Sequence, residues 1–118
     1  MEQIIEKAKD LGNAIARTEE YQALRRAMDA VDEDRELVEL RNRIQELEKK
    51  LEGDVQAGRQ PDEELRNEYT EVAEELQSRP AFQKVIAAQS EFEKVMQKVN
   101  ETVSEGIEEG AKSRIILS

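Results

Sequence analysis

The sequence predicts an all-α protein, a helical bundle of four to five helices built on one long antiparallel helical hairpin. First, only five Gly and two Pro interrupt 118 residues that are rich in Leu, Glu, Lys, Arg, Gln and Ala, which is the composition of long helices. Second, apolar residues recur at steps of three and four between these breaks. Third, the break near the middle of the chain is short, which makes its flanking helices antiparallel neighbours. No β-sheet is expected.

The first helix is expected over residues 3–17, because its apolar side chains recur at helical spacing. They are Ile4, Ile5, Ala8, Leu11 and Ile15. Two glutamates then follow Thr18, and a hydroxyl that accepts from a free backbone N–H next to carboxylates is typical of a helix start. A second helix is therefore expected to begin at Thr18. Its apolar face is Tyr21, Leu24, Ala27, Met28 and Val31.

An acidic stretch, residues 32–34, follows the second helix. It either solvates a continuous helix or caps a new one at Asp34. The clearest periodicity in the chain comes next, a seam of apolar residues that alternate by three and four as in a heptad repeat. This hairpin seam is Leu37, Leu40, Ile44, Leu47 and Leu51, and Val55 extends it. We expect a helix of about 30 Å over residues 36–56, provided that Gly53 does not end it.

The clearest break in the chain is QAGRQP, residues 56–61. Gly58 suits the left-handed conformation that ends a helix, and Pro61 suits the first turn of the next one. The helix that follows has an apolar stripe of its own, formed by Leu65, Tyr69, Val72 and Leu76. The two helices are therefore expected to pack as an antiparallel hairpin with facing stripes.

Ser78 and Pro80 repeat this punctuation, with Ser78 as a cap and Pro80 opening the last and longest helix. Apolar positions run along this helix almost to Gly106: Phe82, Val85, Ile86, Phe92, Val95, Met96, Val99 and Val103. The chain then ends in an apolar tip, residues 115–117, which is expected to be either docked on a groove or frayed. We therefore expect one helical domain, residues 1–110, and a C-terminal tail, residues 111–118.

Composition excludes several classes of function. The chain has no Cys, no His and no Trp, so thiolate nucleophiles, imidazole bases, disulfides and the usual zinc ligands are excluded. The net charge of −10 repels a phosphate backbone, so direct binding of nucleic acid is not expected. No apolar run reaches membrane-spanning length, and residues 1–10 lack the apolar core of a secretory signal. We expect a cytoplasmic protein without membrane insertion.

Two stretches resemble ligand-binding motifs but depart from them. GIEEGAKS, residues 106–113, has three residues instead of four between its glycines, and Ala111 separates the second glycine from Lys112. The acids of residues 32–36 lack the Gly at the sixth position and the carboxylate at the twelfth that a calcium loop requires. We therefore expect no enzymatic activity, no metal and no cofactor.

The apolar seams leave two interpretations open. The favoured one is that the hairpin seam packs within the chain, against the helices that follow it. Helices this long with so few aromatic residues are also expected to leave apolar surface exposed to solvent after folding. Association into a homo-oligomer is the usual way to bury such surface. The candidate oligomer or partner interface is Leu37, Leu40, Ile44, Leu47, Leu51, Phe92, Met96, Val99, Ile115, Ile116 and Leu117. Ile44, Leu47 and Leu51 are expected to be the positions most sensitive to substitution.

A strongly acidic segment, residues 61–80, holds seven acids and two bases and accounts for half of the net charge. Glutamate favours helix formation, so a solvated helix face explains this segment without further function. The alternative is a docking surface for a basic partner.

A distributed pattern runs from Ile4 to Ile107. It comprises the corner at Thr18, Glu19 and Tyr21, the junction at Val31, Asp32 and Asp34, the long helix, the turn from Gly58 to Pro61, and the restart at Pro80 and Phe82. In this pattern the chain resembles the YlbF/YmcA family of small helical bacterial regulators. The resemblance implies an all-helical bundle, commonly self-associating, that acts by binding other proteins.

Relatives in this family are linked to competence, sporulation and biofilm development, and to a complex that adjusts the membrane-anchored ribonuclease Y during messenger RNA processing. The resemblance therefore implies a non-enzymatic regulatory or scaffold protein whose partners are itself and ribonuclease Y or a sister helical regulator. Some relatives are tied to an iron-sulfur cluster, for which this cysteine-free chain supplies no thiolate ligand. The alternative function is a holdase-like helical chaperone that binds unfolded clients in apolar grooves.

Overall fold

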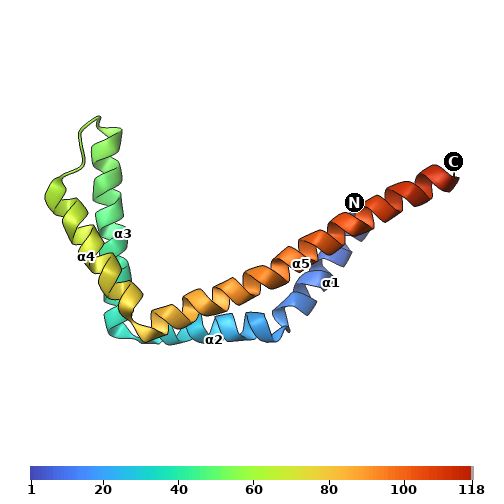
Figure 1. The fold of residues 1–118 in the computed structure, drawn as a ribbon, viewed down its shortest axis with the longest axis horizontal. Helices are drawn as coiled ribbons and strands as arrows, with labels where there is room; N and C mark the ends of the chain where they lie inside the picture. The colour runs from blue at the N-terminus through green and yellow to red at the C-terminus, as the bar shows by residue number, and fades with distance from the viewer. Residues whose placement is uncertain (118) are drawn as a thin grey trace. The chain divides into compact units, whose positions relative to one another are not determined.

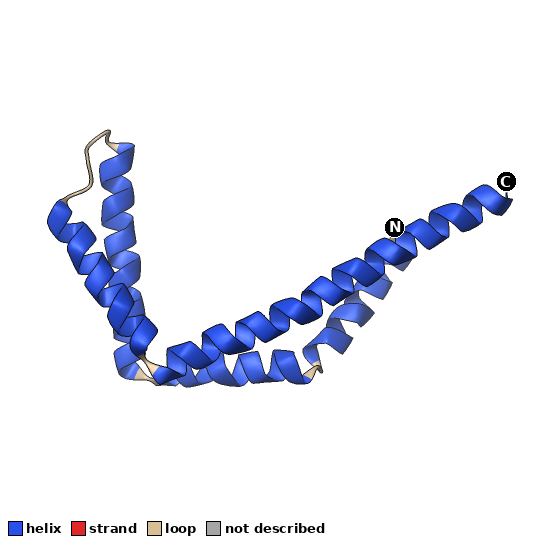
Figure 2. Cartoon of the chain, viewed as in Figure 1, coloured by secondary structure: helices blue, strands red, loops and turns tan. Residues whose placement is uncertain are grey.

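The structure is a computed structural model that describes residues 1–117, with side chains described as far as Lys112. Every regular element in this described part is an α-helix (Figures 1 and 2). The five helices are α1 (Glu2–Ala16), α2 (Glu19–Glu33), α3 (Arg35–Gln56), α4 (Glu63–Ser78) and α5 (Pro80–Leu117). The predicted all-α class, built on an antiparallel helical hairpin, is confirmed.

The chain divides into two compact units. The hairpin unit is residues 25–86, and the terminal unit is residues 1–24 together with residues 87–118. Helices α2 and α5 each contribute residues to both units.

The expected helix starts at Thr18 and Asp34 are both present. The Thr18 hydroxyl oxygen accepts a hydrogen bond from the backbone N–H of Tyr21 at 3.2 Å and donates to the carbonyl of Ile15 at 2.7 Å. The Asp34 carboxylate accepts from the N–H of Leu37 at 3.3 Å, while the backbone of Asp34 is extended. Asp34 therefore ends α2 and caps α3, which decides between the two interpretations of the acidic stretch.

The turn between α3 and α4 has the expected glycine but a different helix start. Helix α3 continues past Gly53, and Gly58 then takes a left-handed conformation with φ of 74°. Pro61 lies outside α4, so the expectation that it opens this helix is wrong. The reason is that the Asp62 carboxylate accepts from the N–H of Glu64 at 3.0 Å and caps the helix one residue later.

Pro80 opens α5 as expected, but Ser78 does not cap it. Ser78 is the last residue of α4, and its hydroxyl donates to the carbonyl of Glu75 at 2.7 Å. Arg79 alone separates the two helices, and its backbone is extended, with ψ of 128°. A residue before proline is driven out of the helical region by the proline ring, so Pro80 itself sets the break at Arg79.

The hairpin unit contains the buried core of the described residues. Its α3 and α4 pack closely as an antiparallel pair, as predicted. Four side chains in this unit are buried: Val31, Leu37, Leu47 and Leu76. Val31, Leu37 and Leu76 form one cluster, against which half-buried side chains of α3 and α5 pack. Full burial of one such side chain stabilises the fold by roughly 1.5–3 kcal/mol, so this small cluster is the main apolar anchor of the unit.

The terminal unit has a different character. Helix α1 runs antiparallel to α5, because Leu11 lies near Val99 and Val103 while Tyr21, further along the chain, meets Phe92 with ring centroids 5.3 Å apart (Figure 1). No residue of α1 is buried.

The last helix is the longest, as expected, and its backbone continues past residue 110 to Leu117. The division into a domain of residues 1–110 and a tail of residues 111–118 stays a prediction.

Candidate interaction surfaces

The hairpin seam is covered by the chain's own helices. Leu37 is 1% exposed and Leu47 is fully buried, while Leu40, Ile44 and Leu51 are half-buried. This is the packing that the intramolecular interpretation expects. A direct role of the seam in contact with a second protein stays a prediction.

Polar contacts tie α3 to α4 alongside the seam. Arg43 Nε donates to Glu68 Oε1 at 2.9 Å, and Arg79 Nη1 donates to Glu36 Oε2 at 2.9 Å. The Tyr69 hydroxyl donates to Glu48 Oε1 at 3.1 Å. These side chains are partly exposed, so each contact adds little stability. Together they favour one register of the hairpin.

These contacts also change the acidity of three side chains. The hydrogen bond to Glu68, and then the one to Glu46, raises the pKa of Arg43. The hydrogen bond to Glu48 is likewise the largest cause of the raised pKa of Tyr69. For Arg79 the pKa is raised first by the hydrogen bond to Glu75 and then by the charge of Glu36.

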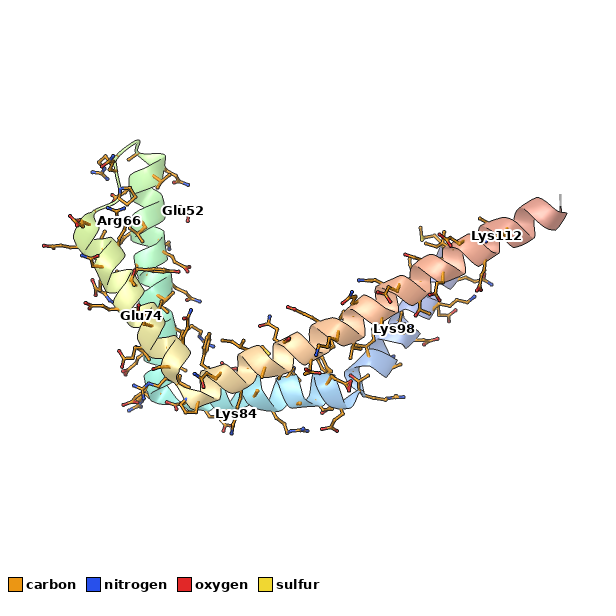
Figure 3. The ribbon with its side chains drawn as sticks, in the orientation of Figure 1. Glu52, Arg66, Glu74, Lys84, Lys98 and Lys112 are labelled. Atoms are coloured by element: carbon orange, nitrogen blue, oxygen red, sulfur yellow. The ribbon has the colours of Figure 1, made fainter. Side chains whose placement is uncertain are left out.

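The acidic segment of residues 61–80 is partly used within the hairpin. Asp62 caps α4, Glu68 pairs with Arg43, and Glu75 pairs with Arg79 at 3.1 Å. The other four acids, Glu63, Glu64, Glu71 and Glu74, are exposed (Glu74 is labelled in Figure 3). Part of the acidic charge therefore has a structural role. Docking of a basic partner on the other acids stays a prediction.

A small apolar cavity of about 140 Å³ opens beside the core of the hairpin unit. Its lining side chains come from three helices and the end of α4: Met28, Val31, Asp32, Arg41, Leu76, Phe82 and Val85. Arg41 Nη1 and Asp32 Oδ1 form an ion pair of 2.8 Å within this lining. Sequence reasoning missed the cavity, because its residues belong to segments far apart in the chain.

Among the described residues, most of the exposed large apolar side chains lie in the terminal unit. All of residues 1–14 and 100–112 are exposed. We define the terminal apolar face by five side chains that are 40–67% exposed: Ile4, Ile5, Leu11, Val103 and Ile107. Phe92, Met96 and Val99, from the predicted interface, are half-buried on α5. The side chains of Ile115, Ile116 and Leu117 lie outside the described residues.

Residues 4–108 match the family described as "Control of competence regulator ComK, YlbF/YmcA". The chain belongs to the YlbF/YmcA family. One relative is a "UPF0342 protein" of Streptococcus mutans serotype c (strain ATCC 700610 / UA159), which is 29% identical over 86 residues. The aligned part is 73% of this chain and 76% of the relative. The predicted resemblance is confirmed, and the family's description supports a regulatory role.

The YlbF/YmcA match spans both units, so neither is an addition to the family's fold. Within residues 1–117, no helix combines the length and apolar character needed to cross a membrane. The same described part contains no group of three or more Asp or Glu side chains arranged to hold a metal ion.

The interface predicted from the sequence includes none of the five side chains of the terminal apolar face. The signal was present, because Ile4, Ala8, Leu11 and Ile15 step by four, three and four along α1. Periodicity identifies an apolar stripe but does not show which stripe a neighbouring helix covers. That distinction needed the structure, in which the hairpin seam is covered and the stripe of α1 is not.

Proposed function

We propose that this YlbF/YmcA-family chain is a non-enzymatic, cytoplasmic regulatory protein that acts by binding other proteins, as a homodimer or larger assembly. Its proposed target is ribonuclease Y-dependent RNA processing, with ribonuclease Y or a sister helical regulator as the partner. The observation that carries the proposal is the terminal apolar face, considered together with the family's description as controlling a competence regulator.

The exposure of this face supports binding. Ile4 is 64% and Ile107 is 67% exposed, although both lie on apolar stripes at helical spacing. Contiguous apolar surface on a folded chain is typical of protein interaction sites. Amphipathic helices commonly bind with such a face in a groove of the partner. The buried leucines of the hairpin unit provide the stable scaffold that presents this face.

The direct test is binding of the purified full chain to the soluble part of ribonuclease Y, with loss of the gene from the host examined in parallel. We expect a saturable complex, and altered transcript ends in the host without the gene. Ile107→Asp should weaken the complex, whereas Ser90→Asp, an exposed position on another side of the same helix and more than four turns away, should not. Absence of a complex together with unchanged transcript ends would contradict the proposal.

The same uncovered face is also what a holdase would use to bind unfolded clients. The two functions differ in selectivity. A dedicated regulator is expected not to suppress aggregation of unrelated thermally unfolded proteins at stoichiometric ratios. Protection of several unrelated clients, lost in Ile107→Asp, would favour the chaperone over the regulator.

A further inference from the structure

A shallow groove follows one face of α5 in the terminal unit. It consists of two adjoining hollows that share Lys98 and Val99. Val95, Val99 and Val103 line it from α5, while Leu11 and Glu20 line it from α1 and α2. Between residues 91 and 103 this groove is about 18 Å long, at roughly 1.5 Å per residue. It is therefore long enough to hold several turns of a helix.

The sequence of α5 has a heptad register along this groove. Val95, Val99, Thr102 and Gly106 occupy core positions, at steps of four, three and four. Thr102 and Gly106 are small, so a second backbone can approach closely at these points. The groove thus has the form of one half of a helix–helix seam.

One edge of this seam carries charges that alternate in sign. Glu91, Lys98, Glu105 and Lys112 are each seven residues apart, so they occupy the same position in successive heptads (Lys98 and Lys112 are labelled in Figure 3). Among the described side chains, Lys98 and Glu105 have no ion-pair partner. Glu91 pairs with its exposed neighbour Lys94 at 3.0 Å. The charges nearest the middle of this edge are therefore available to a second helix.

We propose that this groove binds α5 of a second copy of the chain, antiparallel, about a two-fold axis between residues 100 and 101. This axis brings Lys98 next to Glu105 of the partner subunit, and Glu91 next to Lys112 of the partner subunit. By symmetry each of these opposite-charge contacts forms twice, because a two-fold interface is made from the same patch on both copies.

The charges specify the direction of pairing. In a parallel pair the edge position of one helix faces the opposite edge of the other, and there α5 has Met96, Val103 and Gly110. No charge would then meet Lys98 or Glu105. In the antiparallel pair the same edges meet, so the alternation becomes complementary. The inference rests on the proposed function, in which the chain self-associates, and it names the surface used.

The first test is charge exchange, read by the mass of the purified full chain in sedimentation across a concentration series. The native chain should reach twice its 13.5 kDa mass. Lys98→Glu alone places like charges together twice, and so does Glu105→Lys alone. Each variant should weaken the dimer by about tenfold. An equimolar mixture of the two variants should pair again, because both contacts become complementary in the mixed dimer.

A matched control is Glu93→Lys, which makes the same change in charge on α5 at an exposed position on the side away from Lys98 and Glu105. It should leave the dimer within about twofold of the native chain. High salt should reduce the difference between the charge variants and the native chain. A native chain that stays monomeric, or a mixture no more dimeric than its components, would overturn the proposal.

The second test uses the absence of cysteine from the chain, so that a single introduced thiol reports one contact. Thr102→Cys lies beside the proposed axis and should form a disulfide between copies on mild oxidation. Val95→Cys should not crosslink to itself, but it should crosslink to Gly106→Cys in a mixture of the two variants. Equal self-crosslinking of Val95→Cys and Thr102→Cys would indicate a parallel pair and overturn the proposal.

These measurements use the pure chain, without ribonuclease Y. Loss of dimerisation in Lys98→Glu with retained ribonuclease Y binding would support the pairing surface and separate it from regulation. A native dimer that passes both tests but binds no ribonuclease Y would contradict the proposed function and leave the pairing surface supported.

Discussion

The hairpin unit and the terminal unit are built from the same kinds of amphipathic helix, yet they use their apolar faces differently. In the hairpin unit the hairpin seam packs within the chain, so that Leu37 and Leu47 are buried. In the terminal unit the stripe of α1 remains exposed from Ile4 to Leu11. The same sequence periodicity thus produces a core in one unit and a surface in the other.

The difference shows which part of the molecule covers its own apolar stripe and which part leaves apolar side chains exposed. A short turn at Gly58 returns α4 directly onto α3, so the hairpin seam finds its cover locally. Isolated helices of this length are marginal in water without a packed face. We therefore expect substitutions in the two units to have different consequences.

The largest expected effect is the replacement of Leu47 by Asp. Leu47 is fully buried, so an unpaired carboxylate there should lower the free energy of unfolding by several kcal/mol. Urea unfolding followed by circular dichroism measures the change. The control is Val55→Asp on the same helix, which is 63% exposed and should cost about 0.5 kcal/mol or less. Similar losses in both variants would break the assignment of the core to the hairpin seam.

The next effect concerns the turn that closes the hairpin. Gly58 has φ of 74°, and a Cβ there meets no atom within 4 Å, so Gly58→Ala costs only backbone strain, about 1–2 kcal/mol. The matched change is Gly53→Ala inside α3, also in open space, which should stabilise the fold by roughly 0.5–1 kcal/mol. Thermal unfolding of the two variants should shift in opposite directions. Shifts of the same sign would show that the turn does not depend on a left-handed residue.

The sequence was sufficient for most of the fold, because local signals mark the starts of helices α2 to α5. The side-chain oxygens of Thr18 and Asp34 act through backbone N–H groups three residues away, and such local chemistry is readable in sequence. Pro61 and Ser78 were assigned wrongly, since two residues competed to start or end the same helix. At each site a neighbour decided the boundary: Asp62 by its side-chain cap and Pro80 by its steric effect on Arg79.

The interaction surfaces were less predictable for a physical reason. Leu47 and Ile107 look alike in a periodicity plot, but one is fully buried and the other is 67% exposed. An apolar stripe is buried only where another helix packs on it, and that packing is a property of the tertiary structure. The polar contact between Tyr69 and Glu48 also joins residues 21 positions apart, beyond the reach of local patterns.

Ile107→Asp tests the other side of the comparison. Because Ile107 is already exposed, we expect the free energy of unfolding to change by no more than about 0.5 kcal/mol. Binding to the partner should nevertheless fall markedly, because a carboxylate at an apolar contact is left unpaired on association. Urea unfolding and a binding titration on the same preparation measure both quantities. A large loss of stability would show that the terminal unit has a core of its own at this position.

The smallest expected effect is a change in the titration midpoint of Tyr69. This midpoint reports the hydrogen bond between Tyr69 and Glu48 in the hairpin unit. The hydrogen bond to Glu48 raises the pKa of Tyr69, so this contact is present below the ordinary tyrosine pKa and is lost as pH rises through the raised value. The chain has two Tyr, and the Tyr21→Phe background leaves Tyr69 as the only tyrosine. Ultraviolet absorbance of the ionised phenol then gives the midpoint.

In that background Glu48→Gln removes the carboxylate but keeps an amide oxygen at the same position. The midpoint of Tyr69 should therefore move down toward the ordinary value, because the hydrogen bond to an ionised carboxylate, and then its negative charge, no longer favours the neutral phenol. Glu52→Gln, one turn further along α3, makes the same change in charge without this hydrogen bond and should leave the midpoint nearly unchanged. Equal midpoints in the Tyr21→Phe protein and its two glutamine variants would mean that Glu48 does not hold Tyr69. The register of α3 and α4 would then depend on the apolar seam alone. The hairpin unit would differ from the terminal unit only in the burial of its apolar side chains.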